Sequence, residues 1–210
     1  MKFLEYKPIQ GGFINRFLTT GVFLRESPFH KTVLHGKVNE WLIKSLSVYD
    51  NPCRKEIVQV RIGNVPPYFD FKELFPEDDI EVLGQTKQLK VYFPFGNTSI
   101  DNSGFYANPA YLRSYGCTYL EIPQDENAEF ELSTCGALTV WLNDELVTDY
   151  VPFLRNKEQH TVITISLRKG MNKLVVCLED LAERDTSFFY KVRYLGKQDI
   201  RILIPIKDET

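Results

Sequence analysis

Between Tyr115 and Ile206 the chain consists of short segments in which apolar and polar residues alternate. The segments are separated by residues that favour turns, among them Pro123, Asn143-Asp144 and Gly170. A period of two places every second side chain on the same face, as a half-buried β-strand requires. About six segments of this kind follow one another at intervals typical of a β-sandwich or a β-barrel.

The apolar rows predict which side chains point into the core. In chain order they are Phe130 and Leu132; Leu138, Val140 and Leu142; Ile163, Ile165 and Leu167; Leu174, Val176 and Leu178; Phe188, Tyr190, Val192 and Tyr194; and Ile200, Ile202, Ile204 and Ile206. No helix intervenes that is long enough to connect parallel strands. We therefore predict a mainly all-β fold, an antiparallel β-sandwich of the jelly-roll type.

Trp141 lies between Val140 and Leu142 in the sequence, so it points to the opposite face of its strand. An aromatic side chain of this size on that face needs a cover. Aromatic residues are abundant between Pro67 and Tyr111, a stretch that is otherwise rich in proline and glycine. We predict that the N-terminal segment or a partner domain covers Trp141, and the aromatic residues of this stretch are a candidate for that cover.

The N-terminal part predicts one or two strands over residues 13–24 and a short amphipathic helix over residues 37–46. A second short helix over residues 53–56 and a strand that begins at Ile57 are both compatible with the pattern after Pro52. Within the irregular stretch only residues 89–93 predict a strand. The chain is interpreted as one domain, 1–210, with N-terminal strands and a short helix (1–64), an aromatic-rich insertion (65–111) and core antiparallel strands (112–206).

Composition restricts the function. Hydrophobic residues make up 43% of the 210 residues and charged residues 25%, so the chain can bury a sizeable core. The 25 basic residues are scattered among 28 acidic ones, which argues against a nucleic-acid partner. No apolar stretch approaches the roughly 20 residues of a membrane span, and the first residues show no secretion signal. Four cysteines far apart predict free thiols in a cytoplasmic protein.

The sequence does not predict a catalytic site. His30, His35 and His160 are the only histidines, and neither their number nor their spacing indicates a metal centre. No nucleophile motif and no phosphate-binding glycine loop occurs, and nothing singles out a pair among the many carboxylates. We expect no metal, no cofactor and no catalytic residue.

Binding of a sugar requires fewer specialised residues than catalysis does. An exposed aromatic ring with polar side chains beside it is sufficient. Two loops meet this description. The candidate ligand-binding residues are Tyr150, Phe153 and Arg155 in residues 149–156, and Asn102 and Tyr106 in residues 97–111. The alternative is that these aromatic rings fill the edge of the sandwich.

Three segments resemble the jelly-roll accessory modules of carbohydrate-active enzymes such as glycoside hydrolases. They are YGCTYLEIP at residues 115–123, GALTVWLNDELV at residues 136–147 and LRKGMNKLVV at residues 167–176. The resemblance extends over roughly residues 111–206, and it departs from the common pattern at Asp144, where glycine is usual. It implies a β-sandwich that binds sugar or braces a neighbouring domain.

We therefore expect a non-catalytic accessory domain, the N-terminal part of a larger carbohydrate-active enzyme, that acts in interdomain packing or in weak glycan binding. Its expected partners are a carbohydrate and a C-terminal catalytic domain of the same polypeptide. A module for protein interaction or homodimerisation is the alternative, in which the aromatic insertion forms a self-complementary patch. A small sugar-active enzyme is a third hypothesis.

Overall fold

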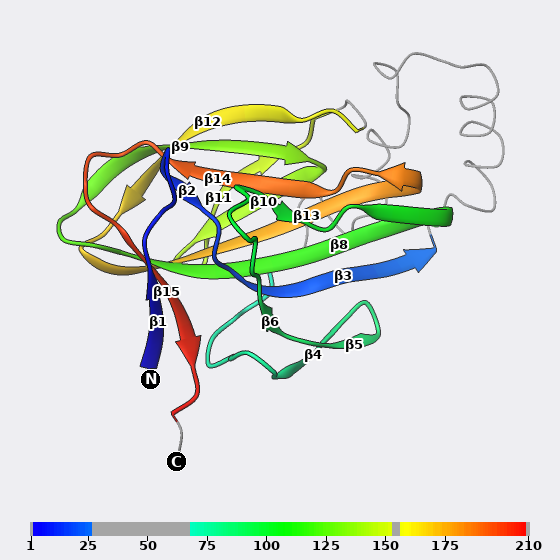
Figure 1. Cartoon of the computed structure of the whole chain (residues 1–210), viewed down its shortest axis with the longest axis horizontal. Helices are drawn as coiled ribbons and strands as arrows, with labels where there is room; N and C mark the ends of the chain where they lie inside the picture. The colour runs from blue at the N-terminus through cyan, green and yellow to red at the C-terminus, as the bar shows by residue number, and fades with distance from the viewer. Residues whose placement is uncertain (1, 27–67, 153–155, 209–210) are drawn as a thin grey trace.

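The computed structural model describes residues 2–26, 68–152 and 156–208 (Figure 1). Every regular element in these ranges is a β-strand, and all strand pairs are antiparallel. The strands are β1 (Lys2–Tyr6), β2 (Phe13–Ile14), β3 (Leu18–Glu26), β4 (Asp79–Val82), β5 (Gln85–Gln88), β6 (Lys90–Val91), β7 (Ile100–Asp101), β8 (Gly104–Ile122), β9 (Glu126–Cys135), β10 (Ala137–Leu142), β11 (Glu145–Tyr150), β12 (Gln159–Leu167), β13 (Gly170–Thr186), β14 (Phe189–Tyr194) and β15 (Arg201–Ile206). The predicted antiparallel β-sandwich is confirmed. The helices predicted over residues 37–46 and 53–56 lie outside the described residues.

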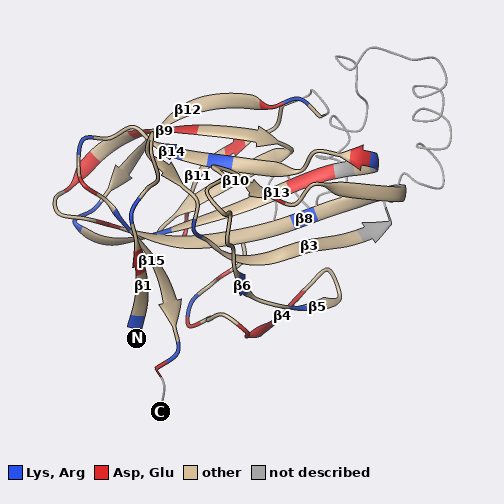
Figure 2. Ribbon diagram, in the orientation of Figure 1, with Lys and Arg blue, Asp and Glu red and all other residues tan. Residues whose placement is uncertain are grey.

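Two sheets form the sandwich. The larger has the order β1-β15-β8-β13-β10-β11, with β3 pairing with both β8 and β6. The smaller has the order β12-β9-β14-β2, and β7 also pairs with β14. The hairpin β4–β5 lies below the larger sheet in Figure 1. Acidic and basic residues are interspersed along the described chain (Figure 2).

The long strands β8 and β13 form the centre of the larger sheet. Their register extends from Ile122 opposite Gly170 to Gly104 opposite Thr186. β8 thus begins well inside the range predicted to be irregular, because its first residues pair with the end of β13. The inner face of this strand pair and the facing strands of the smaller sheet enclose the main core. Its members include Leu120, Leu174, Val176, Leu178, Phe130, Leu132 and Val192, all buried.

The outer face of the larger sheet carries a second core, here called the outer core. Its sheet residues include Tyr115, Cys117, Trp141, Val175 and Cys177, and its covering residues include Tyr68, Phe69, Phe71, Ile80 and Leu89. The ring of Tyr68 meets that of Trp141 edge-on, with centroids 5.6 Å apart. Trp141 is 4% exposed. The described cover of Trp141 is thus the aromatic-rich segment, which was the candidate, and the N-terminal strand β3 contributes Leu18 and Phe23 to the same core.

The turns agree with the sequence analysis. Asn143 and Asp144, both with positive φ, connect β10 to β11 as a two-residue hairpin turn. Gly170 adopts φ +90 at the start of β13, where glycine is free of strain. The expected strand over residues 89–93 is reduced to Lys90–Val91. The described cysteines Cys117, Cys135 and Cys177 are buried thiols that form no disulfide. In the described ranges we find no helix long and apolar enough to span a membrane.

Candidate functional site

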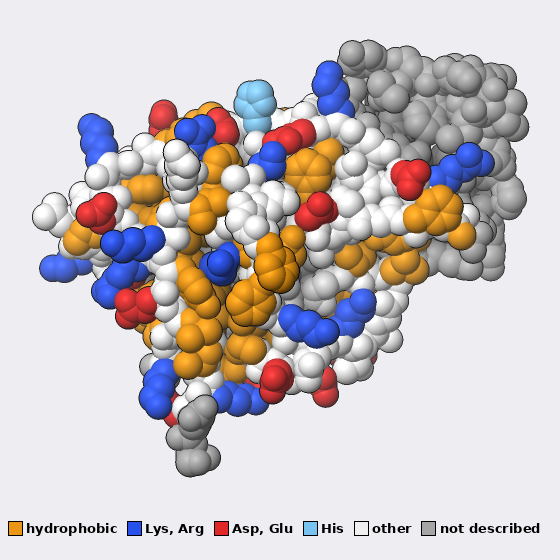
Figure 3. All heavy atoms as spheres, viewed as in Figure 1, with side chains coloured by type: hydrophobic (Ala, Val, Ile, Leu, Met, Phe, Trp, Pro, Cys, Tyr) orange, Lys and Arg blue, Asp and Glu red, His pale blue; other side chains and the backbone are white. Residues whose placement is uncertain are grey.

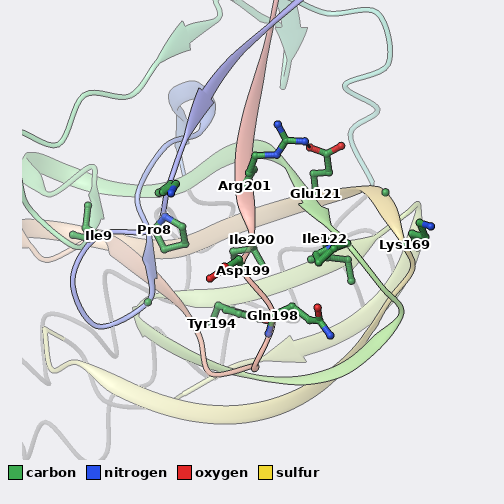
Figure 4. A pocket seen from close by; sticks show the side chains of 14 residues that line it. Pro8, Ile9, Glu121, Ile122, Lys169, Tyr194, Gln198, Asp199, Ile200 and Arg201 are labelled. Atoms are coloured by element: carbon green, nitrogen blue, oxygen red, sulfur yellow. Dashed lines mark hydrogen bonds and ion pairs between the residues drawn. The ribbon is translucent and has the colours of Figure 1, made fainter.

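A pocket of about 810 Å³ opens at the end of the sandwich where β8 finishes (Figure 4). Four segments that are distant in the sequence meet around it. They are the β1–β2 connection, the last residues of β8, the turn between β12 and β13, and the β14–β15 connection. We call this cavity the end pocket. The side chains that bear on its chemistry are Lys7, Glu121, Lys169, Gln198, Asp199 and Arg201.

One wall of the end pocket is an ion-pair network around Arg201. Arg201 and Glu121 are cross-strand neighbours on β15 and β8, and their side chains form an ion pair. The second guanidinium nitrogen lies 3.1 Å from a carboxylate oxygen of Glu5 on β1. Because Arg201 is half exposed, these pairs contribute little to stability. Their effect is to hold the guanidinium group and the Glu121 carboxylate in fixed positions.

The opposite wall is the β14–β15 connection, which carries Gln198 and Asp199. Glu126 fixes its course by accepting a hydrogen bond from the Tyr194 hydroxyl and another, of 2.7 Å, from the backbone N–H of Lys197. The N–H of Gln198 donates to the Tyr194 hydroxyl at 3.0 Å. Burial raises the pKa of the Glu126 carboxyl, but the hydrogen bonds from Lys197 and Tyr194 outweigh it and hold this pKa below its ordinary value.

Apolar residues form the floor of the end pocket. Ile122 and Ile200 are buried there, and Pro8, Ile9 and Pro123 border them. Figure 4 shows Gln198 and Asp199 to one side of the two isoleucines and the pair Arg201–Glu121 to the other. An apolar floor between two hydrogen-bonding walls suits a small molecule with one apolar face and a polar rim.

Gly12 brings the β1–β2 connection close to this floor. Its carbonyl accepts a hydrogen bond of 2.9 Å from the N–H of Tyr194. A Cβ atom at this position would lie 2.4 Å from the Tyr194 carbonyl oxygen, and φ is +83. Only glycine therefore permits the contact that closes this side of the end pocket.

The residues predicted to bind ligand lie elsewhere. Tyr150 ends β11, is partly buried and donates from its hydroxyl to the His160 carbonyl at 3.2 Å. Tyr106 packs against the main core, and burial raises its pKa. The backbone N–H of Asn102 donates to the Phe188 carbonyl at 2.8 Å. These contacts hold the three residues within the chain, and a ligand role for them stays a prediction. Phe153 and Arg155 lie outside the described residues.

The two predicted loops do come together, at the Gly104 end of β8 and so far along that strand from the end pocket. The side-chain amide of Asn156 donates to the Asp185 carbonyl at 2.8 Å, and the N–H of Ser187 donates to the Asn156 side-chain oxygen at 2.8 Å. Phe105 is the cross-strand neighbour of Asp185. A smaller pocket of about 350 Å³ lies between these residues.

The sequence analysis missed the end pocket. Its charged residues come from four parts of the chain and form no motif. Their common signal is that each lies at the end of a strand or in the following connection, where polar residues are usual in any protein. The described residues contain no group of three or more His, Cys, Asp or Glu side chains placed to hold a metal ion.

No protein-family model and no curated protein sequence matches the chain. Solved structures match parts of it. One is a β-glucosidase from Kluyveromyces marxianus in complex with glucose, with a TM-score of 0.36 and 14% identity over 60% of this chain. A family 35 carbohydrate binding module from an environmental isolate gives a TM-score of 0.31 and 16% identity over 51% of this chain and 79% of its own.

A family 35 carbohydrate binding module from Clostridium thermocellum gives a TM-score of 0.28 and 12% identity, and the match covers 52% of this chain and 90% of the module. The match to the β-glucosidase covers 16% of that enzyme's length.

Proposed function

We propose that this chain is a non-catalytic β-sandwich domain that binds carbohydrate in the end pocket, as an accessory part of a carbohydrate-active enzyme. The observation that carries the proposal is the combination of a buried apolar floor, Ile122 and Ile200, with polar side chains on both sides. A pyranose ring presents C–H groups on its faces and hydroxyl groups around its rim. The volume of the end pocket lies within the range of about 300–1,000 Å³ that is usual for small ligands.

The polar walls supply both kinds of hydrogen-bonding group that sugar hydroxyls need. Asp199 offers acceptors, Lys7 and Lys169 offer donors, and Gln198 offers both. The Glu126–Tyr194 hydrogen bond orders the segment that carries Gln198 and Asp199 before any ligand arrives. Such preorganisation lowers the entropic cost of binding.

The arrangement of carboxylates favours binding over hydrolysis. Glycoside hydrolysis uses two carboxyl groups on opposite sides of the glycosidic bond, one of them as a proton donor. Glu121 is engaged in an ion pair with Arg201, which also contacts Glu5. The Glu121 carboxylate is therefore occupied by a contact within the chain. The end pocket thus provides a recognition surface rather than an acid–base pair.

The homodimerisation alternative rested on a self-complementary aromatic patch. In the described part of the insertion, Phe71 and Leu89 are fully buried in the outer core, and Tyr68 and Phe69 pack against it. These four side chains are therefore occupied within the chain, whereas Phe93, Phe95 and Phe105 of the same insertion are exposed.

The test is an NMR titration of the isotope-labelled chain with mono- and oligosaccharides. We expect the amide shifts to include residues 7–12, 121–123, 169–170 and 198–201. Asp199→Ala should weaken binding about tenfold, since a hydrogen bond to a charged group is worth about 1.5–3 kcal/mol. Glu81→Ala, in the distant hairpin β4–β5, is the matched control and should bind normally. Shifts confined to other residues, or none with any saccharide, would contradict the proposal.

A further inference from the structure

The β6–β7 connection displays aromatic rings that the end pocket does not use. Phe95 is 99% exposed and Phe93 is 58% exposed, on either side of the buried Pro94. We call residues 93–97 the aromatic tip. Figure 3 shows hydrophobic side chains gathered in the middle of the face on which this connection lies. A phenylalanine side chain that is fully exposed to water gains none of the free energy that burial in the core would provide.

The backbone of the aromatic tip is strained at Phe95. Phe95 has φ +48 and Gly96 has φ +88, and the N–H of Asn97 donates to the Pro94 carbonyl at 2.9 Å. The two central residues of this turn are both left-handed, a conformation that glycine tolerates and a bulky side chain does not. Strained residues of this kind concentrate at functional positions. Strain and exposure are independent observations on the same side chain.

The aromatic tip is also held firmly. The N–H of Tyr92 donates to the Phe17 carbonyl at 2.9 Å, and the side-chain amide of Asn15 donates to the Asn97 carbonyl at 2.9 Å. The side-chain oxygen of Asn97 accepts a hydrogen bond of 2.8 Å from the Thr98 N–H. These bonds fix both sides of the turn, so the Phe95 ring is presented without further ordering of the backbone.

We infer that Phe95, together with Phe93, is a second carbohydrate contact and that the ligand is a polysaccharide chain rather than a free monosaccharide. The Phe95 ring stacks on the C–H face of one sugar residue, and the exposed Asn97 lies beside it to meet hydroxyl groups. Residues 7–12 border the end pocket, and Asn15 and Phe17 form hydrogen bonds with Asn97 and Tyr92 at the two sides of the aromatic tip. One short segment, residues 7–17, therefore adjoins both proposed contacts. The inference rests on the proposed function for the chemical class of its ligand.

The size of the aromatic tip favours a sugar over a protein partner. Two phenylalanine side chains bury at most about 150–250 Å² each. A stable protein interface needs about 800 Å² from each partner. The residues that follow Phe95, namely Gly96, Asn97 and Thr98, are not apolar and do not enlarge the patch. Two joined contacts bind a polymer more tightly than either contact alone.

The experiment is native gel electrophoresis of the full chain in gels that contain xylan, mixed-linkage β-glucan or a soluble α-glucan. We expect at least one polysaccharide to retard the wild-type chain. Phe95→Ala should weaken the apparent affinity about tenfold, the effect of losing one buried phenylalanine contact. Leu146→Ala is the control, because Leu146 is an apolar side chain with 50% exposure on β11, away from both contacts, and this variant should migrate as the wild type does.

A second variant separates binding from folding. Phe95→Gly should raise the urea midpoint of unfolding, because glycine removes the strain, and should still lose retardation. Wild-type retardation by Phe95→Ala would overturn the inference, as would a wild-type chain that no polysaccharide retards. If Asp199→Ala abolishes binding and Phe95→Ala does not weaken it, the end pocket is the binding site and the proposed aromatic contact is wrong. If Phe95→Ala changes only the oligomeric state in gel filtration, the tip is a protein interface and the inference is wrong.

Discussion

The side-chain nitrogen of Lys173 lies 2.7 Å from a carboxylate oxygen of Asp144. Asp144 also accepts a hydrogen bond from the Tyr68 hydroxyl, and Lys173 lies 3.1 Å from Asp70. Tyr68 and Asp70 belong to the segment that covers the outer core, whereas Asp144 is in the β10–β11 turn. Asp144 therefore connects this cover to the larger sheet.

The first prediction concerns the cost and the benefit of Asp144. Its φ of +73 is unfavourable for a side chain, and its carboxylate makes the ion pair with Lys173. Asp144→Gly removes both the strain and the pair, each worth about 1 kcal/mol, so stability should change by less than about 0.5 kcal/mol. Asp144→Ala keeps the strain and loses the pair, and should cost about 1–2 kcal/mol. Urea unfolding measures both, and an alanine variant more stable than the glycine variant would refute this account.

A second prediction tests the outer core. Trp141→Ala removes the largest side chain beneath the cover and should lower the free energy of unfolding by about 3–5 kcal/mol. The matched control is Leu146→Ala on the neighbouring strand, where a side chain with 50% exposure should cost less than about 0.5 kcal/mol. Denaturant unfolding of both variants measures the two losses of stability. Equal losses would show that the segment over Trp141 contributes no packing.

Much of the fold follows from the sequence because strand alternation is a local signal. The rows around Val140 and Val176, the hairpin at Asn143-Asp144 and the need to cover Trp141 all follow from neighbouring residues. The start of β8 at Gly104 does not, because it depends on pairing with the end of β13. The tertiary partner overrides weak local strand propensity there.

The end pocket was beyond prediction for the same reason. Arg201 and Glu121 are eighty positions apart, and only the register of β15 on β8 places them side by side. Asp199 and Lys169 carry no local mark that distinguishes them from solvated loop residues. The expected binding loops were chosen for aromatic content, but Tyr106 is used for packing. Phe95 has the required exposure, and its sequence does not reveal that.

The third prediction uses two glycines with positive φ. At Gly12 (φ +83) a new Cβ would lie 2.4 Å from the Tyr194 carbonyl oxygen, whereas at Gly84 (φ +70) it would meet nothing within 4 Å. Gly84→Ala should therefore cost only the backbone strain, about 1 kcal/mol. Gly12→Ala should cost more and should also weaken saccharide binding, because it displaces a border of the end pocket. Thermal unfolding and the NMR titration measure the two effects. Equal destabilisation by both substitutions would contradict the close contact.

The last prediction concerns pH and Glu126. The ordinary pKa of a glutamate is 4.5, and hydrogen bonds hold that of Glu126 lower in the folded chain. A carboxyl whose pKa falls on folding stabilises the protein above its unfolded pKa, and this contribution is lost as the pH falls through the folded pKa. Stability should thus decline below about pH 4.5 partly through Glu126.

Glu126→Gln tests this contribution, because the amide does not titrate over this range and its single oxygen can accept only one of the two hydrogen bonds, which Tyr194 and Lys197 donate to different carboxylate oxygens. The variant should be less stable than the wild type at neutral pH, and the two urea midpoints should converge as the medium is acidified. Saccharide affinity should follow the same course in the wild type, because protonation of Glu126 loosens the segment that carries Gln198 and Asp199. Parallel midpoint curves for the two proteins would show that Glu126 does not contribute to the acid response. If the two urea midpoints converge but the saccharide affinity of the wild type does not change with pH, the Glu126 hydrogen bonds do not order the end pocket.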